Sequence, residues 1–418
     1  MADDSLPPDA GVPSPASGPR SSSGAAANPA SAGGGGSSVP SHRARRASGG
    51  SKGSGRSKVL PVILVVVAVV LVGGVIGLVV GSKKNASTTA TTAPTPTTAA
   101  VAAAPTCPLT GTPAPGGTVP ARPALGVKIG NYSGDRPSAG LNAADLVFEE
   151  PVEGSITRLL AVYQCQTASV VGDLRSAREP DVGILSQLSK PLFVHAGGIT
   201  PVLDLLQAAP LTDLNLLSGS NASLIVRVPG RVAPYSTFVN TASVWATAPA
   251  DTTPPAPIFQ YTTAPPPGSV AGSGGSAHIP FSSNSDVTWT WNPSGGAYLR
   301  SYAYGPDKLI DGNQVASTNV VIMTVQTSIG TWVENAEGGK EVYVTATGTG
   351  PLVVLRSGVA ITGTWSRSSL TQPASLTSSS GQAITLEPGN TWIELVPQGV
   401  PVTTTPAAPT PASTTTAP

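Results

Sequence analysis

Two arginines three residues apart, with a serine between them, are the residues of this chain best suited to chemistry. Arg175 and Arg178 flank Ser176 in the segment Arg-Ser-Ala-Arg. A guanidinium donates parallel hydrogen bonds to a phosphate or a carboxylate, and the serine hydroxyl adds another donor. Backbone N–H groups at the start of a helix expected from Asp181 would strengthen anion binding. The segment predicts an anionic ligand, unless these arginines pair with nearby glutamates and stabilise the fold.

Other polar residues of this region are expected at strand ends and turns. In sheets flanked by helices, the loops at strand ends are where ligands usually bind. The candidate ligand-binding residues are Asn131, Arg136, Glu149, Glu153, Thr157, Arg158, Arg175, Ser176, Arg178 and His195. His195 follows an apolar strand and precedes two glycines, so both a core histidine and a pocket histidine stay open. No catalytic residue is assigned.

Several common catalytic and cofactor motifs are missing from the sequence. The folded region has no phosphate-binding glycine loop, no Gly-x-Ser-x-Gly elbow and no His/Cys group with zinc spacing. Glu149 and Glu153 could form a carboxylate site, but nothing in the sequence fixes their separation. We therefore expect no metal ion and no cofactor.

Strands that alternate with short helices are expected to position these residues. Apolar or alternating runs predict strands at 124–129, 145–150, 159–164 and 191–195, and helices at 181–188 and 201–209. Such alternation favours an α/β domain, which we place at residues 117–255.

A different pattern follows from about residue 256. Short β-branched and aromatic runs are separated by Gly, Pro, Asn or Asp, which predicts a mostly antiparallel β domain at 256–398. The expected strands are 287–291, 298–304, 319–326, 341–346, 351–356, 360–366, 383–386 and 392–396.

Ordered motifs across residues 120–397 resemble the YerB-like family of bacterial envelope proteins. The elements that carry this resemblance are Asn131, Arg136-Pro137, Gly140-Leu141, Glu149, Glu153-Gly154, Thr157-Arg158, Arg175-Ser176-Ala177-Arg178, Gly348-Thr349-Gly350-Pro351, Ile361-Thr362-Gly363-Thr364-Trp365-Ser366-Arg367 and Leu386-Glu387-Pro388-Gly389-Asn390-Thr391-Trp392. The resemblance implies a two-part envelope protein, commonly a lipoprotein, without an assigned biochemical function. The chain departs from the family pattern at Tyr235 and Ser236, where a Pro-His-Asn element is expected. These side chains cannot reproduce the acid–base role of an imidazole near neutral pH.

An uncharged run of 22 residues from Val59 to Val80 predicts a transmembrane helix at 59–81. Six basic residues closely precede the run and only Lys83 and Lys84 closely follow it, so we expect a cytoplasmic N-terminus and an extracellular C-terminal part. A cleaved signal peptide is the alternative, but its apolar core would be shorter and closer to the N-terminus. The remaining segments are predicted as a disordered tail at 1–58, a Thr/Ala/Pro-rich spacer at 82–116 and a disordered tail at 399–418.

The part of the chain beyond the membrane segment is acidic and contains both cysteines. From residue 85 onward 14 basic and 19 acidic residues give a net charge of −5. This charge argues against nucleic-acid binding, which depends on neutralising phosphates. An isolated pair in an oxidising compartment favours a disulfide between Cys107 and Cys165. A lipid-modified or catalytic cysteine is the alternative.

These features favour a membrane-anchored envelope protein that binds an anionic or glycan ligand, or a protein partner, outside the membrane. The enzymatic alternative is a transferase or hydrolase acting on a lipid-linked phosphate or a cell-wall glycan. The third is a purely structural partner in an envelope complex. The expected partners are thus the membrane, a cell-wall or phosphate-bearing ligand and another envelope protein, and not nucleic acid.

Overall fold

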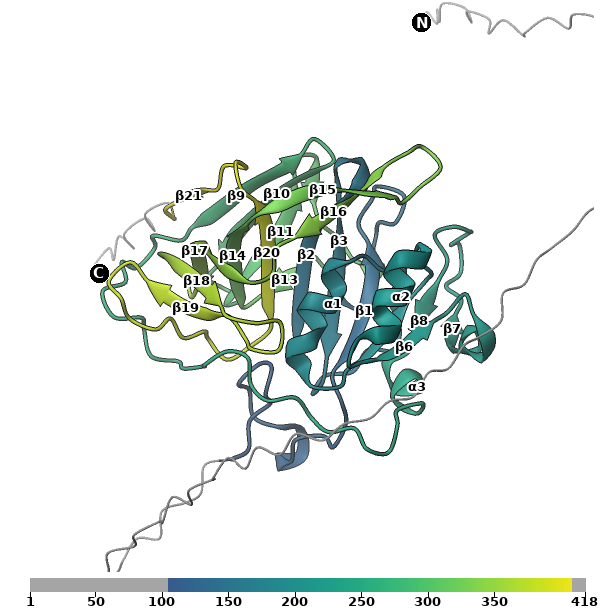
Figure 1. The fold of residues 1–418 in the computed structure, drawn as a ribbon. Helices are drawn as coiled ribbons and strands as arrows, with labels where there is room; N and C mark the ends of the chain where they lie inside the picture. The colour runs from purple at the N-terminus through teal and green to yellow at the C-terminus, as the bar shows by residue number, and fades with distance from the viewer. Residues whose placement is uncertain (1–103, 408–418) are drawn as a thin grey trace, which may run out of the picture. The chain divides into compact units, whose positions relative to one another are not determined.

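Two sheets that pack face to face organise residues 104–407, the part of the chain that the computed structural model describes (Figure 1). The larger sheet has ten strands. In spatial order they are β19 (Ser375–Ser378), β18 (Val359–Arg367), β17 (Gly348–Arg356), β14 (Asn319–Val325), β20 (Thr391–Pro397), β2 (Leu146–Val152), β3 (Ile156–Tyr163), β1 (Leu125–Gly130), β5 (Leu192–His195) and β6 (Thr212–Asn215).

The smaller main sheet has six strands and comes entirely from the second half of the chain. It contains β12 (Gly305–Pro306), β11 (Ala297–Tyr302), β10 (Ser285–Asn292), β9 (Ser276–Ser282) and β21 (Thr403–Thr405), with β13 (Ala316–Ser317) beside β11. Two minor sheets are the hairpin β15 (Thr327–Val333) and β16 (Lys340–Val344), and the group β4 (Val171–Gly172), β8 (Phe238–Val239) and β7 (Ile225–Val226).

Alternating side chains of the larger sheet build a core on each of its faces. On β2, Val147 faces the smaller sheet and Phe148 faces the opposite side, as the period of a strand requires. The core between the sheets contains the tryptophans Trp289 and Trp392. On the other face Leu185 of α1 (Pro180–Leu185) packs in the second core.

Two helices cover the part of the larger sheet that comes from the first half of the chain (Figure 1). They are α1 and α2 (Thr200–Ala208), and both carry a proline in the first turn, where its missing N–H leaves no bond unmade. A third helix, α3 (Thr241–Trp245), begins at Asn240, whose side chain accepts a hydrogen bond from the Ser243 N–H. The predicted helices at 181–188 and 201–209 are therefore confirmed.

The described part of the chain is mostly β, so the α/β class predicted for residues 117–255 needs correction. β1, β2 and β3 form an antiparallel group, and among pairs within the first half of the described chain only β1–β5 and β5–β6 are parallel. Turns that contain Gly140 (φ 83°) and Gly154 (φ 75°) connect these strands. In the second half the strands are antiparallel except that β14 and β20 pair in parallel.

The two halves of the chain share the larger sheet. β20, from the second half, pairs with β14 on one side and with β2 of the first half on the other. The strands β6, β9, β15 and β19 and the two-residue strands β4, β8, β12 and β13 were not predicted, and residues 383–386 form only isolated bridges. Residues 403–405 form β21, although the sequence predicts a disordered tail from 399.

Cys107 and Cys165 form the predicted disulfide, with their Cα atoms 5.9 Å apart. The bridge joins the start of the described chain to the segment after β3. Within residues 104–407 no helix has the length and hydropathy needed to cross a bilayer. The apolar segment at 59–80, its basic flank and the spacer before residue 104 lie outside the described residues.

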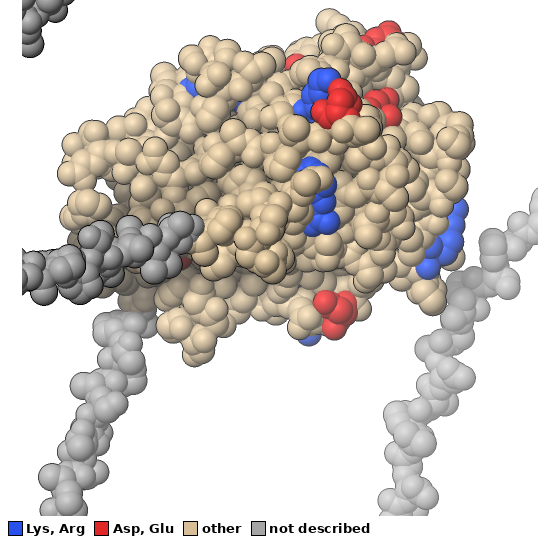
Figure 2. Space-filling view, turned by 90° about the horizontal axis from the view of Figure 1, so that it is seen from below, with Lys and Arg blue, Asp and Glu red and all other residues tan. Residues whose placement is uncertain are grey.

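Charged side chains are sparse on the surface. Only 11% of the residues of the chain are charged. Figure 2 shows one face with only a few acidic and basic side chains, some of them adjacent to one another, on an otherwise uncharged surface. A local gathering of arginines is therefore not a consequence of a generally charged surface.

Candidate functional site

Three of the candidate residues, Asn131, Glu149 and Thr157, lie together in the core between the two main sheets. Adjacent strands position two of them, Glu149 on β2 and Thr157 on β3, and Asn131 directly follows β1. Thr157 Oγ1 donates to Glu149 Oε1 at 2.7 Å, and Asn131 Nδ2 donates to the same oxygen at 3.1 Å. All three residues are buried. They form part of the interior and do not line an open site.

The smaller sheet completes this buried network. Arg300 Nη2 donates to Glu149 Oε2 at 2.7 Å, and Trp289 Nε1 donates to Glu394 Oε1 at 2.7 Å. Burial and the neighbouring Glu149 raise the pKa of Glu394 well above its ordinary value. The network joins the two sheets through polar contacts that water does not reach.

Arg178, Arg158 and Glu153 form a second buried group beside the hairpin β15–β16. Arg178 Nε donates to Glu153 Oε2 at 2.8 Å, Nη2 donates to the other oxygen of that carboxylate, and Nη1 lies 3.1 Å from Glu334 Oε2. Arg158 donates to the Ser176 carbonyl at 2.7 Å, and burial lowers its pKa to about 10. Both guanidiniums are engaged by groups of the fold itself.

Acidic groups outnumber the arginines at this place. Glu179, Glu334 and Glu341 each have one buried carboxyl oxygen that finds no hydrogen-bond partner in the described part of the chain. Burial and Glu334 raise the pKa of Glu341 to about 8, and burial and Glu341 raise the pKa of Glu179 to about 7. Near neutral pH, protonation of Glu179 and Glu341 reduces the repulsion among the three carboxyl groups.

His195 lies in the core and not in a pocket. Its Nε2 is 2.6 Å from Asp213 Oδ1, and its Nδ1 is 2.7 Å from the Gly197 carbonyl oxygen. Ser176 Oγ donates instead to the Ala196 carbonyl at 3.2 Å. Both ring nitrogens therefore face acceptors, and His195 does not act as a base toward Ser176 in this arrangement.

The remaining two candidates, Arg136 and Arg175, lie closer to solvent with Arg231, Tyr235 and Tyr304. We call these five residues the arginine–tyrosine surface. Arg136 also donates to Asn131 of the buried network. Arg136 donates to the Tyr304 hydroxyl, Arg231 donates to the Arg136 carbonyl at 3.2 Å, and the Arg175 guanidinium lies 4.7 Å from the centre of the Tyr235 ring. The surface thus combines segments from both halves of the chain.

Positive charge exceeds negative charge on this surface. Arg175 forms an ion pair with Asp135 at 2.6 Å, whereas no carboxylate among residues 104–407 lies within 4.0 Å of Arg136 or Arg231. Arg136 and Arg231 donate to carbonyl and amide oxygens instead. Solvent reaches 23% of the Arg175 side chain and 72% of Tyr304.

Tyr235 stands where the family resemblance predicts a histidine-containing element. Its ring packs against Gly134 so closely that a Cβ there would lie 2.5 Å from it. Its carbonyl accepts a hydrogen bond from Arg231 Nε at 3.0 Å. The position that departs from the family pattern therefore belongs to the arginine–tyrosine surface.

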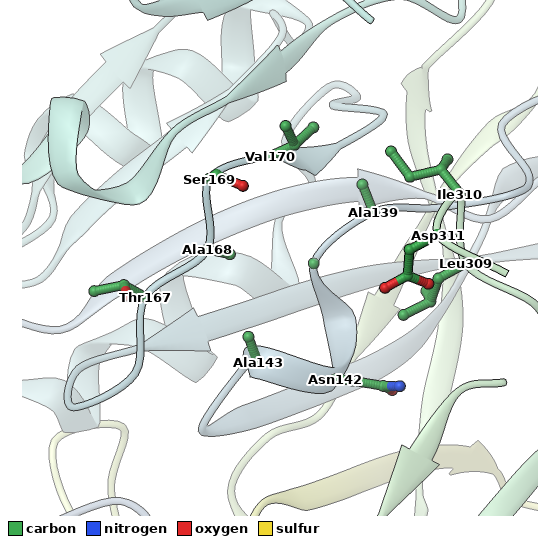
Figure 3. Close-up of a pocket in the computed structure, with 11 residues that line it drawn as sticks. Ala139, Asn142, Ala143, Thr167, Ala168, Ser169, Val170, Leu309, Ile310 and Asp311 are labelled. Carbon is green, nitrogen blue, oxygen red and sulfur yellow. The ribbon is translucent and has the colours of Figure 1, made fainter. Parts of the chain in front are cut away.

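A cavity of about 500 Å³ opens where three segments meet (Figure 3). Residues 139–143 and 167–170 come from the first half of the chain, and residues 309–311 come from the second. Figure 3 shows Ser169 and Asp311 among its lining residues, with several alanines. None of the candidate residues lines this cavity.

Sequence reasoning grouped Arg175 with Arg178, but their guanidiniums bind different partners. The sequence did not point to Arg231, to Tyr304 or to the cavity, and it did not indicate that Tyr235 lies at the surface. The alternation of Tyr302 and Tyr304 with Ala303 is the one sequence pattern that could have indicated this surface, because it places both rings on one face of the chain. In the structure these rings stack with their centroids 5.2 Å apart. Among residues 104–407 no group of three His, Cys, Asp or Glu side chains has an arrangement that could hold a metal ion.

The chain matches the models of both parts of one family, described as a protein of unknown function (DUF3048). The N-terminal domain matches at residues 109–254 and the C-terminal domain at 277–393. YerB of Bacillus subtilis (strain 168), named as a candidate lipoprotein, is 35% identical over 133 residues, which cover 32% of this chain and 39% of that protein. The match therefore spans about two fifths of that relative.

A crystal structure of YerB from Bacillus subtilis shows the same fold. The TM-score is 0.59 at 24% sequence identity, and the match covers 71% of this chain and 99% of that chain. Together with the family models, this likeness confirms the resemblance that the sequence motifs indicated.

Proposed function

This chain belongs to the DUF3048 family of proteins of unknown function, and we propose that it binds an anionic ligand at the arginine–tyrosine surface. We further propose that the segment 59–81 anchors it in the cell membrane, with residues 104–407 on the outer side. The name of the Bacillus subtilis relative, a candidate lipoprotein, supports a place in the cell envelope. In this chain a transmembrane helix would replace the lipid as the anchor.

The observation that carries this proposal is the imbalance of charge on one small surface. Arg231 donates hydrogen bonds to the carbonyl oxygens of Arg136 and Asp135, and Arg175 forms an ion pair with the Asp135 carboxylate. Among residues 104–407, Asp135 is the single carboxylate that forms an ion pair with Arg136, Arg175 or Arg231. Arginines suit phosphate and carboxylate groups, because the planar donors match both oxygens. By contrast, the Arg178 guanidinium is already bound by two glutamates.

Tyrosines add a second property to this surface. Tyr304 is exposed, and its ring stacks on Tyr302 at an interplanar angle of 10°. An exposed aromatic face offers apolar contact, and its hydroxyl can hydrogen-bond a ligand. The surface is therefore suited to an anion that is attached to a larger organic body.

The test uses the full-length chain in detergent and inorganic polyphosphate as the probe. Removing two positive charges with Arg175→Gln/Arg231→Gln is expected to weaken binding about tenfold or more, since hydrogen bonds to charged groups contribute about 1.5–3 kcal/mol each. Lys190→Gln is the matched control, because it also removes one positive charge, at an exposed position. Lys190 lies before the start of β5, whereas Arg175 contacts the residue that follows the end of β5, so the two charges lie at opposite ends of this strand. Equal affinity of the wild type and the double variant would overturn the proposal.

A hydrolase is the second candidate function. The observation that favours it is a glutamate with a raised pKa, Glu179, in the wall of a groove. Glu179 lines a groove of about 400 Å³ together with Leu205 and Tyr343. Burial and Glu341 raise its pKa to about 7, which suits a general acid near neutral pH. The test is hydrolysis of cell-wall glycan by the wild type and by Glu179→Gln. Release of reducing ends that the variant loses would favour this function, and equal release would exclude Glu179 as the acid.

A further inference from the structure

The three chain segments that line the cavity of about 500 Å³ also carry Arg136, Arg175 and Tyr304 of the arginine–tyrosine surface. Arg136 precedes the lining residue Ala139 by three positions, so their Cα atoms are at most about 11 Å apart. Arg175 follows Val170, and Tyr304 precedes Leu309, by five positions each, which limits these separations to about 18 Å.

Hydrogen bonds keep these segments side by side between the cavity and the surface. The Ala139 N–H donates to the Gly172 carbonyl at 2.6 Å, and the Ile310 N–H donates to the Ser138 carbonyl at 2.9 Å. The first bond joins the segments of Arg136 and Arg175, and the second joins those of Arg136 and Tyr304. A ligand of a few units can therefore contact both places at once.

The chemistry of the cavity differs from that of the surface. No lysine or arginine lines it, and Asp311 supplies a carboxylate that would repel an anion. Thr167 and Ser169 are exposed and offer hydroxyl groups, while alanines form much of the wall and leave room. Figure 3 shows the carboxylate of Asp311 near Leu309 and Ala139, on the opposite side of the view from Thr167 and Ser169. Carboxylate and hydroxyl groups hydrogen-bond the hydroxyls of an uncharged polar unit.

We infer that the ligand is an anionic glycopolymer, whose phosphate or carboxylate binds the arginine–tyrosine surface while a neighbouring neutral sugar occupies the cavity of Ser169 and Asp311. This inference rests on the proposed function and names the chemical class of its ligand. An anion without sugars would contact only the arginines. A neutral sugar without the anion would contact only the cavity.

The test compares two forms of one polymer with the full-length chain in detergent. The first form is poly(ribitol phosphate) substituted with N-acetylglucosamine, and the second is the same polymer after its sugars are removed. Ser169→Trp fills the cavity and is expected to weaken binding of the substituted form about tenfold, with no change for the stripped form. Ala250→Trp, at an exposed turn outside the cavity, is the matched control.

A second variant keeps the inference testable if Ser169→Trp fails to fold. Asp311→Asn preserves the shape of an exposed side chain and is expected to weaken binding of the substituted form about fivefold, without weakening that of the stripped form. Equal binding of the substituted form by both cavity variants and the wild type would overturn the inference. If only the arginine variants lost binding, the proposed function would stand without the inference. If the wild type bound polyphosphate but neither form of this polymer, the inference would likewise fall and the proposed function would stand.

Discussion

Arg300 and Glu149 connect the two main sheets through a hydrogen bond of 2.7 Å between Nη2 of the arginine and Oε2 of the glutamate. Both side chains have 0% exposure. Burial alone would lower the pKa of Arg300, but the charge of Glu149 raises it well above its ordinary value. The pair also connects the two halves of the sequence, because Glu149 lies on β2 and Arg300 on β11.

Arg300→Leu is expected to lower the free energy of unfolding by about 3–5 kcal/mol, because it leaves the Glu149 carboxylate buried without its counter-charge. Urea denaturation at neutral pH measures this loss. The control is Lys308→Leu at an exposed position of the same half of the chain. It is expected to change the free energy of unfolding by less than about 0.5 kcal/mol. A loss for Arg300→Leu as small as that of the control would show that the pair contributes little.

Arg178→Gln is expected to destabilise the fold by about 3 kcal/mol, since it removes the cation between Glu153 and Glu334. The same substitution at exposed Arg227 serves as the comparison and should be nearly neutral. Thermal unfolding followed by circular dichroism checks the difference. If Arg178→Gln instead retained full stability and lost polyphosphate binding, the ligand would bind at Arg178 and not at the arginine–tyrosine surface.

Glu341 makes stability depend on pH. Burial and Glu334 raise its pKa from about 4.5 to about 8, so the folded protein keeps a proton that the unfolded chain releases. The free energy of unfolding should therefore fall as pH rises through this window. Glu341→Gln, which resembles the protonated carboxyl, is expected to remove this contribution. Urea denaturation at about pH 5, 7 and 9 tests it, with exposed Glu337→Gln of the same hairpin as the control. Parallel pH profiles of the wild type and Glu341→Gln would contradict the prediction.

Removing the disulfide with Cys107→Ala/Cys165→Ala is expected to lower the free energy of unfolding by about 4 kcal/mol, because the bridge closes a loop of 58 residues. Reduction of the wild type with dithiothreitol before denaturation should give a similar loss. Both samples can be compared by urea denaturation. Should the double variant match the oxidised wild type, residues 104–124 would add stability by packing alone.

Local elements of the fold could be predicted from the sequence because their signals are local. The apolar run of β3 marks a strand buried on both faces, and Pro201 marks the first turn of α2. The strand β9 was missed because Pro280 interrupts its alternating run, and a proline argues against a strand. The pairing of β20 with β2 joins segments about 245 residues apart, for which periodicity carries no information.

The candidate site could be predicted only in part, because residue type does not reveal the partner of a charge. Arg175 and Arg178 look equivalent in the sequence. In the structure one has a side chain that is 23% exposed and the other one that is 3% exposed. Asn131, Glu149 and Thr157 were expected at strand ends and turns, but the sequence does not indicate that they meet in the core or that a strand of the smaller sheet, with Arg300, covers them.

Because β20 lies between β14 and β2, the larger sheet cannot be completed around β2 until the last part of the chain has been synthesised. β2 is synthesised early, yet one edge of it has no partner until residues 391–397 have been made. A chain that stops before that point presents an open row of backbone donors and acceptors, which other chains can pair with. Loss of a short stretch near the C-terminus would therefore harm the earliest part of the fold.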